Sequence, residues 1–434
     1  MALNVSTPKE FNDDSVLNCI NKYFITIQEE EVKAANSHLQ KVLKSLLARM
    51  KTVDKLFEKS YQELLFVGSF YKGTKVGKPE EFDLDIIIEL PINYNNIQIN
   101  KFQPGYVTLR AELKLDSNIN QSELKTLKNF INEKGFVNQE KFRCWFESII
   151  SKVECQLLRE KGNYLLDDYL IKFKKSGPAF TLCVKYGLKE LFVDLVPALR
   201  FTHNSDISKL KAFKSKKFVL VPKPMKTDGS SNGTKTAYAW RLSFFEQEKE
   251  LLTQNGTVKP IIRYLKKLRD TQNWKSIASY YIETIILHLL YNMKEQDKAN
   301  LNKLPRTLMF FQMLIRCNDA FKNRSIPFFW DEKYNLLQDI SIIELDNISG
   351  RLNKIICKIK YNLVQDKFII AKYILNAEEY HEFLNKFSIN SAISESNLLR
   401  MDSQNDTDDT LHGNINESWI VKGINYIERL LTRQ

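Results

Sequence analysis

The chain has 434 residues and a mass of 50.8 kDa, which is enough for a two-lobed domain or two packed domains with a sizeable core. Apolar residues make up 43% of the chain and charged residues 27%, a balance that excludes wholesale disorder. The net charge of +12 indicates a polyanionic partner, either nucleic acid or an anionic membrane.

The sequence also bears on where the protein works. No apolar run approaches the roughly 20 residues that span a bilayer, so we expect no transmembrane segment. The polar, acidic start over residues 1–15 argues against a secretory signal. The six cysteines are scattered and contain no CxxC pair, which favours a reducing compartment over a disulfide scaffold. We therefore expect a cytoplasmic protein.

Composition and periodicity divide the chain into four segments. Residues 27–61 lack Gly and Pro and repeat apolar residues at helical spacing, so they predict one long helix. One strand is predicted over 82–90, and a pair of strands joined by a tight turn at Gly187 is predicted within 181–196. The first predicted segment, 1–62, contains the long helix, and the second, 63–235, contains the strands and a Lys-, Ser-, Gly- and Pro-rich loop from residue 204. The third, 236–390, is almost wholly helical. The fourth, 391–434, is a polar loop followed by a final helix at 418–431.

A glycine turn precedes the first predicted strand. Gly68 and Ser69 open it, and such a turn leaves backbone N–H groups and a hydroxyl free to hold phosphate oxygens. A Gly-Ser pair alone is weak evidence, because most such pairs bind nothing. Its position ahead of an acidic strand gives it weight.

Acidic residues lie on both predicted strands. Glu81, Asp83 and Asp85 alternate along the first strand and therefore share a face, and an apolar run at 86–88 continues that strand. Asp194 is a lone acid within the second apolar strand. Acids on a strand usually mark a solvated face, but acids that lead into a buried strand need a cation or donors nearby. Two neighbouring carboxylates with a third on an adjacent strand predict a two-metal phosphoryl-transfer site.

At these residues the chain resembles the Mab21 / cGAS-like nucleotidyltransferase family, and most of all the insect cGAS-like receptors. The motifs are GS at 68–69, EFD at 81–83, VDLVPAL at 193–199, WRLSFFEQEKELL at 240–252 and ASYYIETIILHLL at 278–290. The resemblance implies a bilobal α/β (α+β) fold. A polymerase-beta-like nucleotidyltransferase sheet would be backed by the long spine helix, and a helical second lobe would close the cleft.

The resemblance also implies the catalytic metal ligands. Matching EFD to the family motif makes Glu81, Asp83 and Asp194 the ligands of two Mg²⁺ or Mn²⁺ ions. A rival register, in which the acids directly precede IIIEL, gives Asp83 and Asp85 instead. We prefer the first register because its distance from Ser69 fits the family better.

By the same resemblance, residues of both lobes bind the nucleotides. Phe245 stands where the family often has Ser, so the purine preference stays open. For the donor triphosphate, Arg263 is an alternative to Lys266. The implied nucleotide-binding residues are Gly68, Ser69, Arg241, Ser243, Glu248, Lys266, Ser279 and Tyr280.

The vertebrate DNA sensor of this family carries a zinc insertion after the position of Glu248. Here the link from Leu252 to Lys259 contains neither Cys nor His. We therefore expect no structural zinc, and double-stranded DNA is disfavoured as the ligand.

Lysines form one stripe on the predicted long helix. At 100° per residue they lie within about 80°, opposite the apolar stripe, and extend over about 39 Å. A solvated lysine face is the ordinary explanation, but near-absence of interleaved acids and a length that suits a duplex favour nucleic acid. The basic ridge consists of Lys33, Lys41, Lys44, Lys51, Lys55 and Lys59.

The resemblance, taken with the basic ridge, implies a double-stranded-RNA sensor that joins ATP and GTP into a cyclic dinucleotide of the cyclic GMP-AMP type, in innate antiviral signalling. RNA would shift the 68–78 segment, seating Ser69 and aligning the carboxylates. Oligomerisation on RNA is compatible with this prediction, and a membrane role is disfavoured because the opposite helix face is needed for the core. The alternatives are a template-independent oligo- or polyadenylate-type polymerase and a catalytically silent Mab21-like interaction protein.

Overall fold

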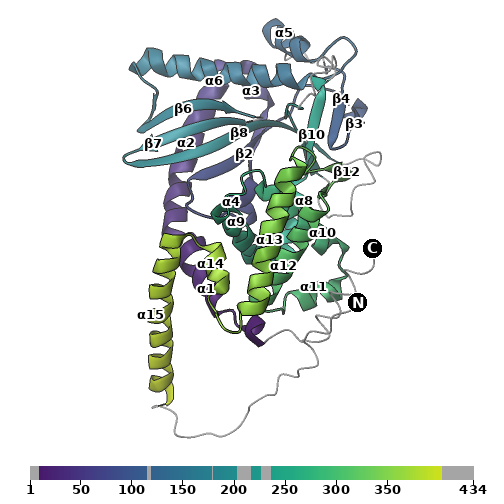
Figure 1. The fold of residues 1–434 in the computed structure, drawn as a ribbon. Helices are drawn as coiled ribbons and strands as arrows, with labels where there is room; N and C mark the ends of the chain where they lie inside the picture. Colours follow the sequence, from purple (N-terminus) through teal and green to yellow (C-terminus); the bar gives the residue numbers. More distant parts are fainter. Residues whose placement is uncertain (1–8, 115–118, 178, 203–216, 226–235, 403–434) are drawn as a thin grey trace. The chain divides into compact units, whose positions relative to one another are not determined.

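The computed structural model describes residues 9–114, 119–177, 179–202, 217–225 and 236–402. The described chain divides into two compact units (Figure 1). The sheet unit comprises Ile27–Gln254 and Pro327–Leu336, and the helical unit comprises the remainder. Mixed helix and antiparallel sheet agree with the predicted α/β class.

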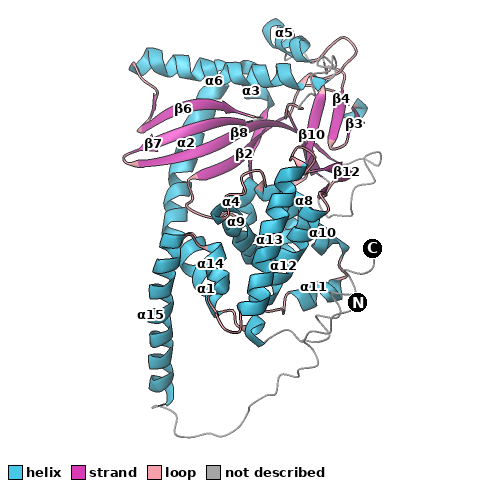
Figure 2. Ribbon diagram, in the orientation of Figure 1, coloured by secondary structure: helices cyan, strands magenta, loops and turns pink. Residues whose placement is uncertain are grey.

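The sheet unit is built on one large twisted sheet (Figure 2). Its order is β3-β4-β10-β9-β8-β7-β6-β5, and β2 pairs with both β1 and β8. Every pairing in it is antiparallel except that of β2 with β8, which is parallel. The strands are β1 (Tyr61–Val67), β2 (Glu81–Ile88), β3 (Gln98–Gln103), β4 (Tyr106–Arg110), β5 (Leu165–Leu166), β6 (Tyr169–Ser176), β7 (Ala179–Tyr186), β8 (Lys189–Thr202), β9 (Lys217–Val221) and β10 (Ala239–Ser243).

Two long helices cover one face of this sheet. The ring of Phe146 on α6 (Gln139–Lys161) lies 5.5 Å from that of Phe180 on β7, and His38 on α2 (Glu29–Val53) stacks on Tyr186 at 4.1 Å. Phe180 and Tyr186 are an even number of residues apart and so point to the same face. In Figure 2, α2 passes behind β6, β7 and β8. The odd-numbered residues between them, Thr181 among them, therefore face away from these helices.

The predicted long helix is interrupted near its end. Asp54 has extended backbone angles, and its side chain accepts a hydrogen bond from the Phe57 amide to start a second helix, α3 (Lys55–Ser60). A carboxylate at an N-cap satisfies amides that a new helix leaves unpaired. The residue after α3, Tyr61, already begins β1. The prediction of a single helix over 27–61 is therefore wrong at Asp54, although the apolar spacing is correct on both sides.

Smaller elements complete the sheet unit. The hairpin of β11 (Pro327–Phe328) and β12 (Asp331–Asn335) comes from far along the chain, and Asp331 accepts a hydrogen bond of 2.9 Å from the Gly105 amide. The helices not yet named are α4 (Gly68–Lys72), α5 (Gln121–Phe130) and α8 (Phe245–Gln254), with one turn of 3-10 helix at Tyr94–Asn96.

The helical unit packs around α9, whose buried face includes Ile261, Ile262 and Leu265. The N-terminal segment joins this unit, since Asp14 accepts hydrogen bonds from the backbone amides of Arg306 and Thr307 at the start of α12. Its helices are α1 (Ser15–Ile20), α9 (Val258–Thr271), α10 (Ser279–Asn292), α11 (Glu295–Leu301), α12 (Arg306–Lys322), α13 (Ile342–Asn362), α14 (Ile369–Ile374) and α15 (Ala377–Asp402), with short 3-10 and π turns at Lys9–Asn12 and Asn21–Ile25.

The C-terminal prediction is partly wrong. α15 continues to Asp402, so the polar loop predicted from residue 391 does not begin there. The final helix predicted at 418–431 lies outside the described residues, as does most of the loop predicted at 204–235. Among the described residues no helix combines the length and the apolar character that crossing a bilayer requires.

Candidate active site

Asp83 and Asp194 lie side by side on the sheet. β2 and β8 run parallel, and their register makes the Cα atoms of Asp83 and Asp194 direct partners. Both side chains are half-buried, while their neighbours in sequence on each strand are fully buried. Because side chains alternate along a strand, both carboxylates project from the face opposite to α2 and α6.

A glycine at the end of β1 approaches the same carboxylate. Val67 pairs with Asp83, and Gly68 follows with φ of +78°, in the left-handed region. A Cβ placed on Gly68 would stand 1.8 Å from Oδ2 of Asp83. Only glycine fits here, for both reasons. Ser69 comes next, at the start of α4, and its carbonyl oxygen accepts a hydrogen bond of 2.9 Å from the Thr74 amide.

Burial and like charge act on the acids of β2. Burial and the neighbouring charge of Asp194 raise the pKa of Asp83 to about 6. Burial and the charge of Asp83 raise the pKa of Asp85 to about 7. A raised pKa means that the fold disfavours the charged form of these carboxyl groups. A bound cation would stabilise the charged form.

The two proposed metal registers differ in structure. Glu81 lies at the exposed start of β2, and its carboxylate forms an ion pair with Lys75. Asp85, in contrast, is only 5% exposed. Asp83 belongs to both registers and is the residue that contacts Gly68.

The residues present fit a divalent ion only in part. Asp83 and Asp194 offer hard oxygen donors side by side, the type that Mg²⁺ and Mn²⁺ prefer. Within the described ranges, however, no group of three or more His, Cys, Asp or Glu side chains is arranged to hold a metal. Glu81 would be the third donor, and one of its oxygens is paired with Lys75.

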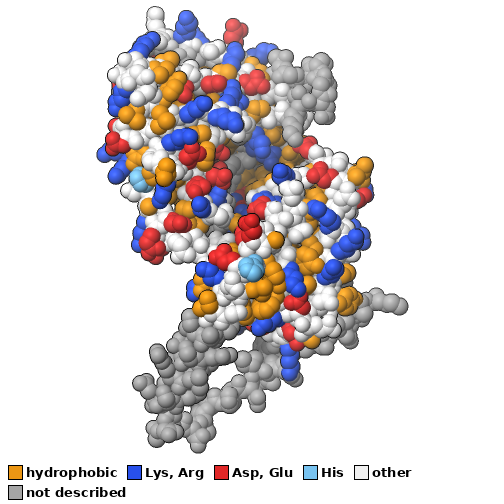
Figure 3. All heavy atoms as spheres, turned by 60° about the vertical axis from the view of Figure 1, so that its left-hand side comes forward, with side chains coloured by type: hydrophobic (Ala, Val, Ile, Leu, Met, Phe, Trp, Pro, Cys, Tyr) orange, Lys and Arg blue, Asp and Glu red, His pale blue; other side chains and the backbone are white. Residues whose placement is uncertain are grey.

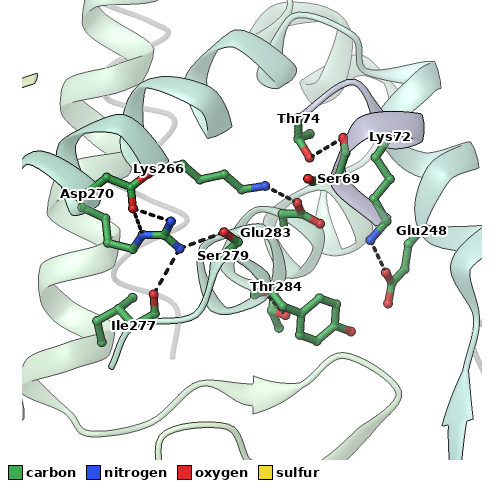
Figure 4. Close-up of polar contacts among 12 residues, drawn as sticks. Ser69, Lys72, Thr74, Glu248, Lys266, Asp270, Ile277, Ser279, Glu283 and Thr284 are labelled. Atoms are coloured by element: carbon green, nitrogen blue, oxygen red, sulfur yellow. Dashed lines mark hydrogen bonds and ion pairs between the residues drawn. The ribbon is translucent and has the colours of Figure 1, made fainter. Parts of the chain in front are cut away.

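Glu248 is buried in a polar cluster of the sheet unit. Its Oε2 accepts a hydrogen bond of 2.6 Å from Nζ of Lys72, and its Oε1 accepts one of 2.8 Å from Nε1 of Trp330. Figure 4 shows Lys72 and Glu248 pointing toward one another. The Trp330 ring stacks on Phe244 at 4.2 Å, and the Lys72 ammonium lies 5.5 Å from the centre of the Phe245 ring. Both carboxylate oxygens are therefore engaged, and α4 is tied to α8.

Arg241 is surrounded by aromatic rings. Its guanidinium carbon lies 4.2 Å from the ring centre of Phe328, 4.7 Å from that of Tyr334 and 5.1 Å from that of Tyr106. Its Nη1 is buried, and it has no hydrogen-bond partner among the described residues. Ser243 lies two residues along β10, where it pairs with Val219 of β9.

The remaining predicted nucleotide-binding residues belong to the helical unit. Lys266 is buried, and its Nζ donates a hydrogen bond of 2.5 Å to Glu283. Ser279 accepts one of 2.8 Å from Arg269, and Tyr280 beside it is half-buried. Figure 4 shows the contact of Lys266 with Glu283. Arg263, the alternative to Lys266, donates to Asn21 at 3.2 Å.

The lysines of the basic ridge lie at the surface, but they have more acidic neighbours than the helix alone suggested. All are exposed except Lys51, which is half-buried with its ammonium 4.4 Å from the Tyr61 ring centre. The acidic partners of the ridge are Glu29 for Lys33, Glu58 for Lys55 and Glu123 for Lys59. On the face shown in Figure 3, basic and acidic side chains are likewise interspersed. Lys41 and Lys44 have no ion-pair partner among the described residues.

Comparisons with known proteins agree with this geometry. Residues 70–254 match the Mab-21 protein nucleotidyltransferase domain, and residues 257–354 match the Mab-21 protein HhH/H2TH-like domain. A protein of Trichogramma pretiosum called "Cyclic GMP-AMP synthase-like receptor" is 33% identical over 98% of this chain and 85% of its own length. Proteins of the same name from Microplitis demolitor and Tribolium castaneum are 36% and 33% identical, over 86% of this chain and 69% and 94% of theirs. The chain belongs to the cGAS-like receptor family of Mab-21 nucleotidyltransferases.

Membership of the cGAS-like receptor family confirms the resemblance drawn from the five motifs, and with it a nucleotidyltransferase domain. Three side chains close to the motifs were not predicted: Thr181, which donates a hydrogen bond of 2.5 Å to Asp194, Lys75 and Trp330. The sequence indicated Lys75 only as one of the lysines that flank the turn, and it did not single out Thr181 or Trp330. Thr181 is brought next to Asp194 by the pairing of β7 with β8, which the sequence does not reveal. Trp330 reaches Glu248 because the hairpin of β11 and β12 comes from a distant part of the chain.

Proposed function

We propose that this nucleotidyltransferase is a nucleic-acid sensor that, when activated by double-stranded RNA, converts ATP and GTP into a cyclic dinucleotide of the cyclic GMP-AMP type. The observation that carries the proposal is the pairing of Asp83 with Asp194 beside the Gly68–Ser69 turn. The name shared by the relatives, "Cyclic GMP-AMP synthase-like receptor", favours a cyclic product over a linear one. A cytoplasmic location and a role in antiviral signalling are part of the same proposal.

Asp83 and Asp194 would hold Mg²⁺ or Mn²⁺, with Glu81 as the third ligand of the preferred register. A divalent ion held there neutralises phosphate charge and lowers the pKa of the attacking hydroxyl. No zinc enters the proposal.

The chain's own donors would bind the nucleotides. The turn at Gly68 and Ser69 is suited to phosphate oxygens, and the buried Nη1 of Arg241 is a donor that a nucleotide oxygen would satisfy. Ser243 lies on the same strand. Lys266, Ser279 and Tyr280 complete the proposed set. Glu248 already accepts from Lys72 and Trp330, so a base would share the carboxylate with these donors or replace one of them.

Activation would act on the segment that carries Lys75. The Lys75–Glu81 ion pair occupies one oxygen of Glu81, and opening it would free that oxygen for a cation shared with Asp83. A polyanion competes with Glu81 for a lysine ammonium, and it would thereby favour the open state. The basic ridge would supply the main RNA contacts, with Lys41 and Lys44 the first to test.

The direct test is product formation. Purified protein is incubated with ATP, GTP and Mg²⁺ or Mn²⁺, with duplex RNA, duplex DNA, single-stranded RNA or no nucleic acid, and products are separated by chromatography before and after phosphatase treatment. We expect a phosphatase-resistant product that depends on duplex RNA. Linear, phosphatase-sensitive chains would favour the polymerase alternative, and no product under any condition would favour the silent interaction protein.

Charge reversal tests the basic ridge. K41E/K44E should weaken RNA binding and lower the slope of log affinity against log salt, by somewhat less than one unit for each phosphate that the variant no longer neutralises. K358E/K360E, on α13 of the helical unit, is the matched control. Equal effects of the two double variants would reject the basic ridge as the RNA site.

A further inference from the structure

Thr181 is on the same face of the sheet as the acid pair. It lies on β7, where its Cα is the register partner of Asp194, and Asp194 is in turn the partner of Asp83 on β2. Thr181, Asp194 and Asp83 thus form one row across three adjacent strands. Partner side chains on neighbouring strands stand close enough to interact directly.

The Thr181 hydroxyl donates a hydrogen bond of 2.5 Å to Oδ1 of Asp194. The direction is fixed, because an ionised carboxylate only accepts hydrogen bonds. No other hydrogen bond from the described residues reaches the carboxylate of Asp194. The bond therefore occupies one carboxylate oxygen and leaves Oδ2 without a protein partner in the described chain.

The residue type suits this role. Threonine is β-branched, so its χ1 angle is restricted, and it favours strands. Its hydroxyl is thus held on a rigid element. Carboxylates that bind metals are commonly oriented by such outer hydrogen bonds, and loss of one typically weakens metal affinity.

We propose that Thr181 is a positioning residue that fixes the carboxylate of Asp194 for a divalent cation. The inference rests on the proposed function in assigning a metal to Asp194, and it adds a residue outside the metal ligands. By holding Oδ1, Thr181 restricts rotation of the Asp194 carboxylate and leaves Oδ2 available to a cation beside Asp83.

The test compares three variants of the full chain. T181V removes the hydroxyl while keeping the branched shape, T181S keeps the hydroxyl, and T126V is the matched control, because the Thr126 hydroxyl donates to the Ser122 carbonyl on α5, away from the acids. Mn²⁺ binding is measured by electron paramagnetic resonance, and thermal unfolding is followed without metal. We expect T181V to weaken Mn²⁺ binding about 10- to 100-fold, while T181S and T126V stay close to the unchanged chain.

Activity provides a second readout. Once product formation is established, T181V should lower kcat with little change in KM for ATP, because Thr181 orients a ligand of the metal and does not touch the nucleotide. The Mn²⁺ measurement needs no turnover, so it tests Thr181 even if no cyclic product is found. Unchanged Mn²⁺ affinity in T181V, or an equal loss in T181S, would overturn the inference. A loss of Mn²⁺ affinity that merely follows a fall in unfolding temperature shared with T126V would overturn it as well.

Discussion

Substituting Gly68 by alanine is the sharpest test of how the turn and the acid pair fit together. The new Cβ would stand 1.8 Å from Oδ2 of Asp83, and its other nearest neighbours, the Cγ and Cβ of Asp83, lie at 2.5 and 2.7 Å. An ordinary contact of about 3.5 Å therefore requires a displacement of about 1.7 Å. The Asp83 carboxylate must move or the turn must open.

Two costs follow, and they can be separated. A non-glycine residue with φ of +78° costs about 1–2 kcal/mol in stability. A displacement of about 1 Å at a reacting centre costs about 100-fold in rate. We therefore expect G68A to retain a folded structure with modestly lower stability, to lose at least about 100-fold in product formation, and to bind Mn²⁺ more weakly.

Gly77 supplies the matched control. Its φ is +85°, so alanine there pays the same backbone cost, but nothing lies within 4 Å of the position of its Cβ. Unfolding in urea, Mn²⁺ affinity and product formation are measured for G68A and G77A side by side. If G77A loses as much activity as G68A, backbone strain alone explains the effect and the contact between Gly68 and Asp83 has no special role.

Three further predictions concern charges in the sheet unit. K75M removes the ion-pair partner of Glu81. A partly exposed ion pair contributes about 0–1 kcal/mol, so Mn²⁺ affinity without nucleic acid should rise by up to about 5-fold. An unchanged affinity would argue that Lys75 does not hold Glu81 away from the metal. The raised pKa of Asp85, about 7, means that the folded chain binds its proton more tightly than the unfolded chain does, so stability falls as the pH rises from about 4 to about 7. D85N should therefore stabilise the metal-free chain at pH 8, by about 1.4 kcal/mol for each unit of pKa shift relieved, and have little effect at pH 4, as measured by urea unfolding; equal effects at both pH values would contradict this. K72M removes the ammonium that pairs with the buried carboxylate of Glu248 and should cost about 3–5 kcal/mol, part of which K72M/E248Q recovers; a cost below about 1 kcal/mol in the same assay would show that the pair is not effectively buried.

The sequence predicted what depends on local pattern. Helical spacing identified the buried stripe of α2, including Leu39, Leu46 and Met50, and the alternation of acids identified β2. The sequence did not predict the break at Asp54, because an aspartate also occurs on the polar face of a continuous helix. The break is visible only in the structure, where the Asp54 side chain caps α3 by accepting a hydrogen bond from the Phe57 amide. Local pattern thus predicts elements better than their ends.

Contacts between distant segments were beyond the sequence. The motifs indicated that Asp83 and Asp194 meet, but the partners that surround the motif residues came only from the fold. Glu248 was predicted as a base-reading residue, whereas its bonds to Lys72 and Trp330 depend on a hairpin some 80 residues away in the chain. Likewise the Lys75–Glu81 ion pair depends on how the 73–80 segment folds back onto β2.

The most direct measurement of the central claim is the number of Mn²⁺ ions bound in the presence of a non-hydrolysable ATP analogue, determined by electron paramagnetic resonance. The unchanged chain and D168N, an exposed control beside β6, should bind two ions, whereas D83N and D194N should each lose at least one. Full Mn²⁺ binding by both D83N and D194N would contradict a metal site built on this acid pair.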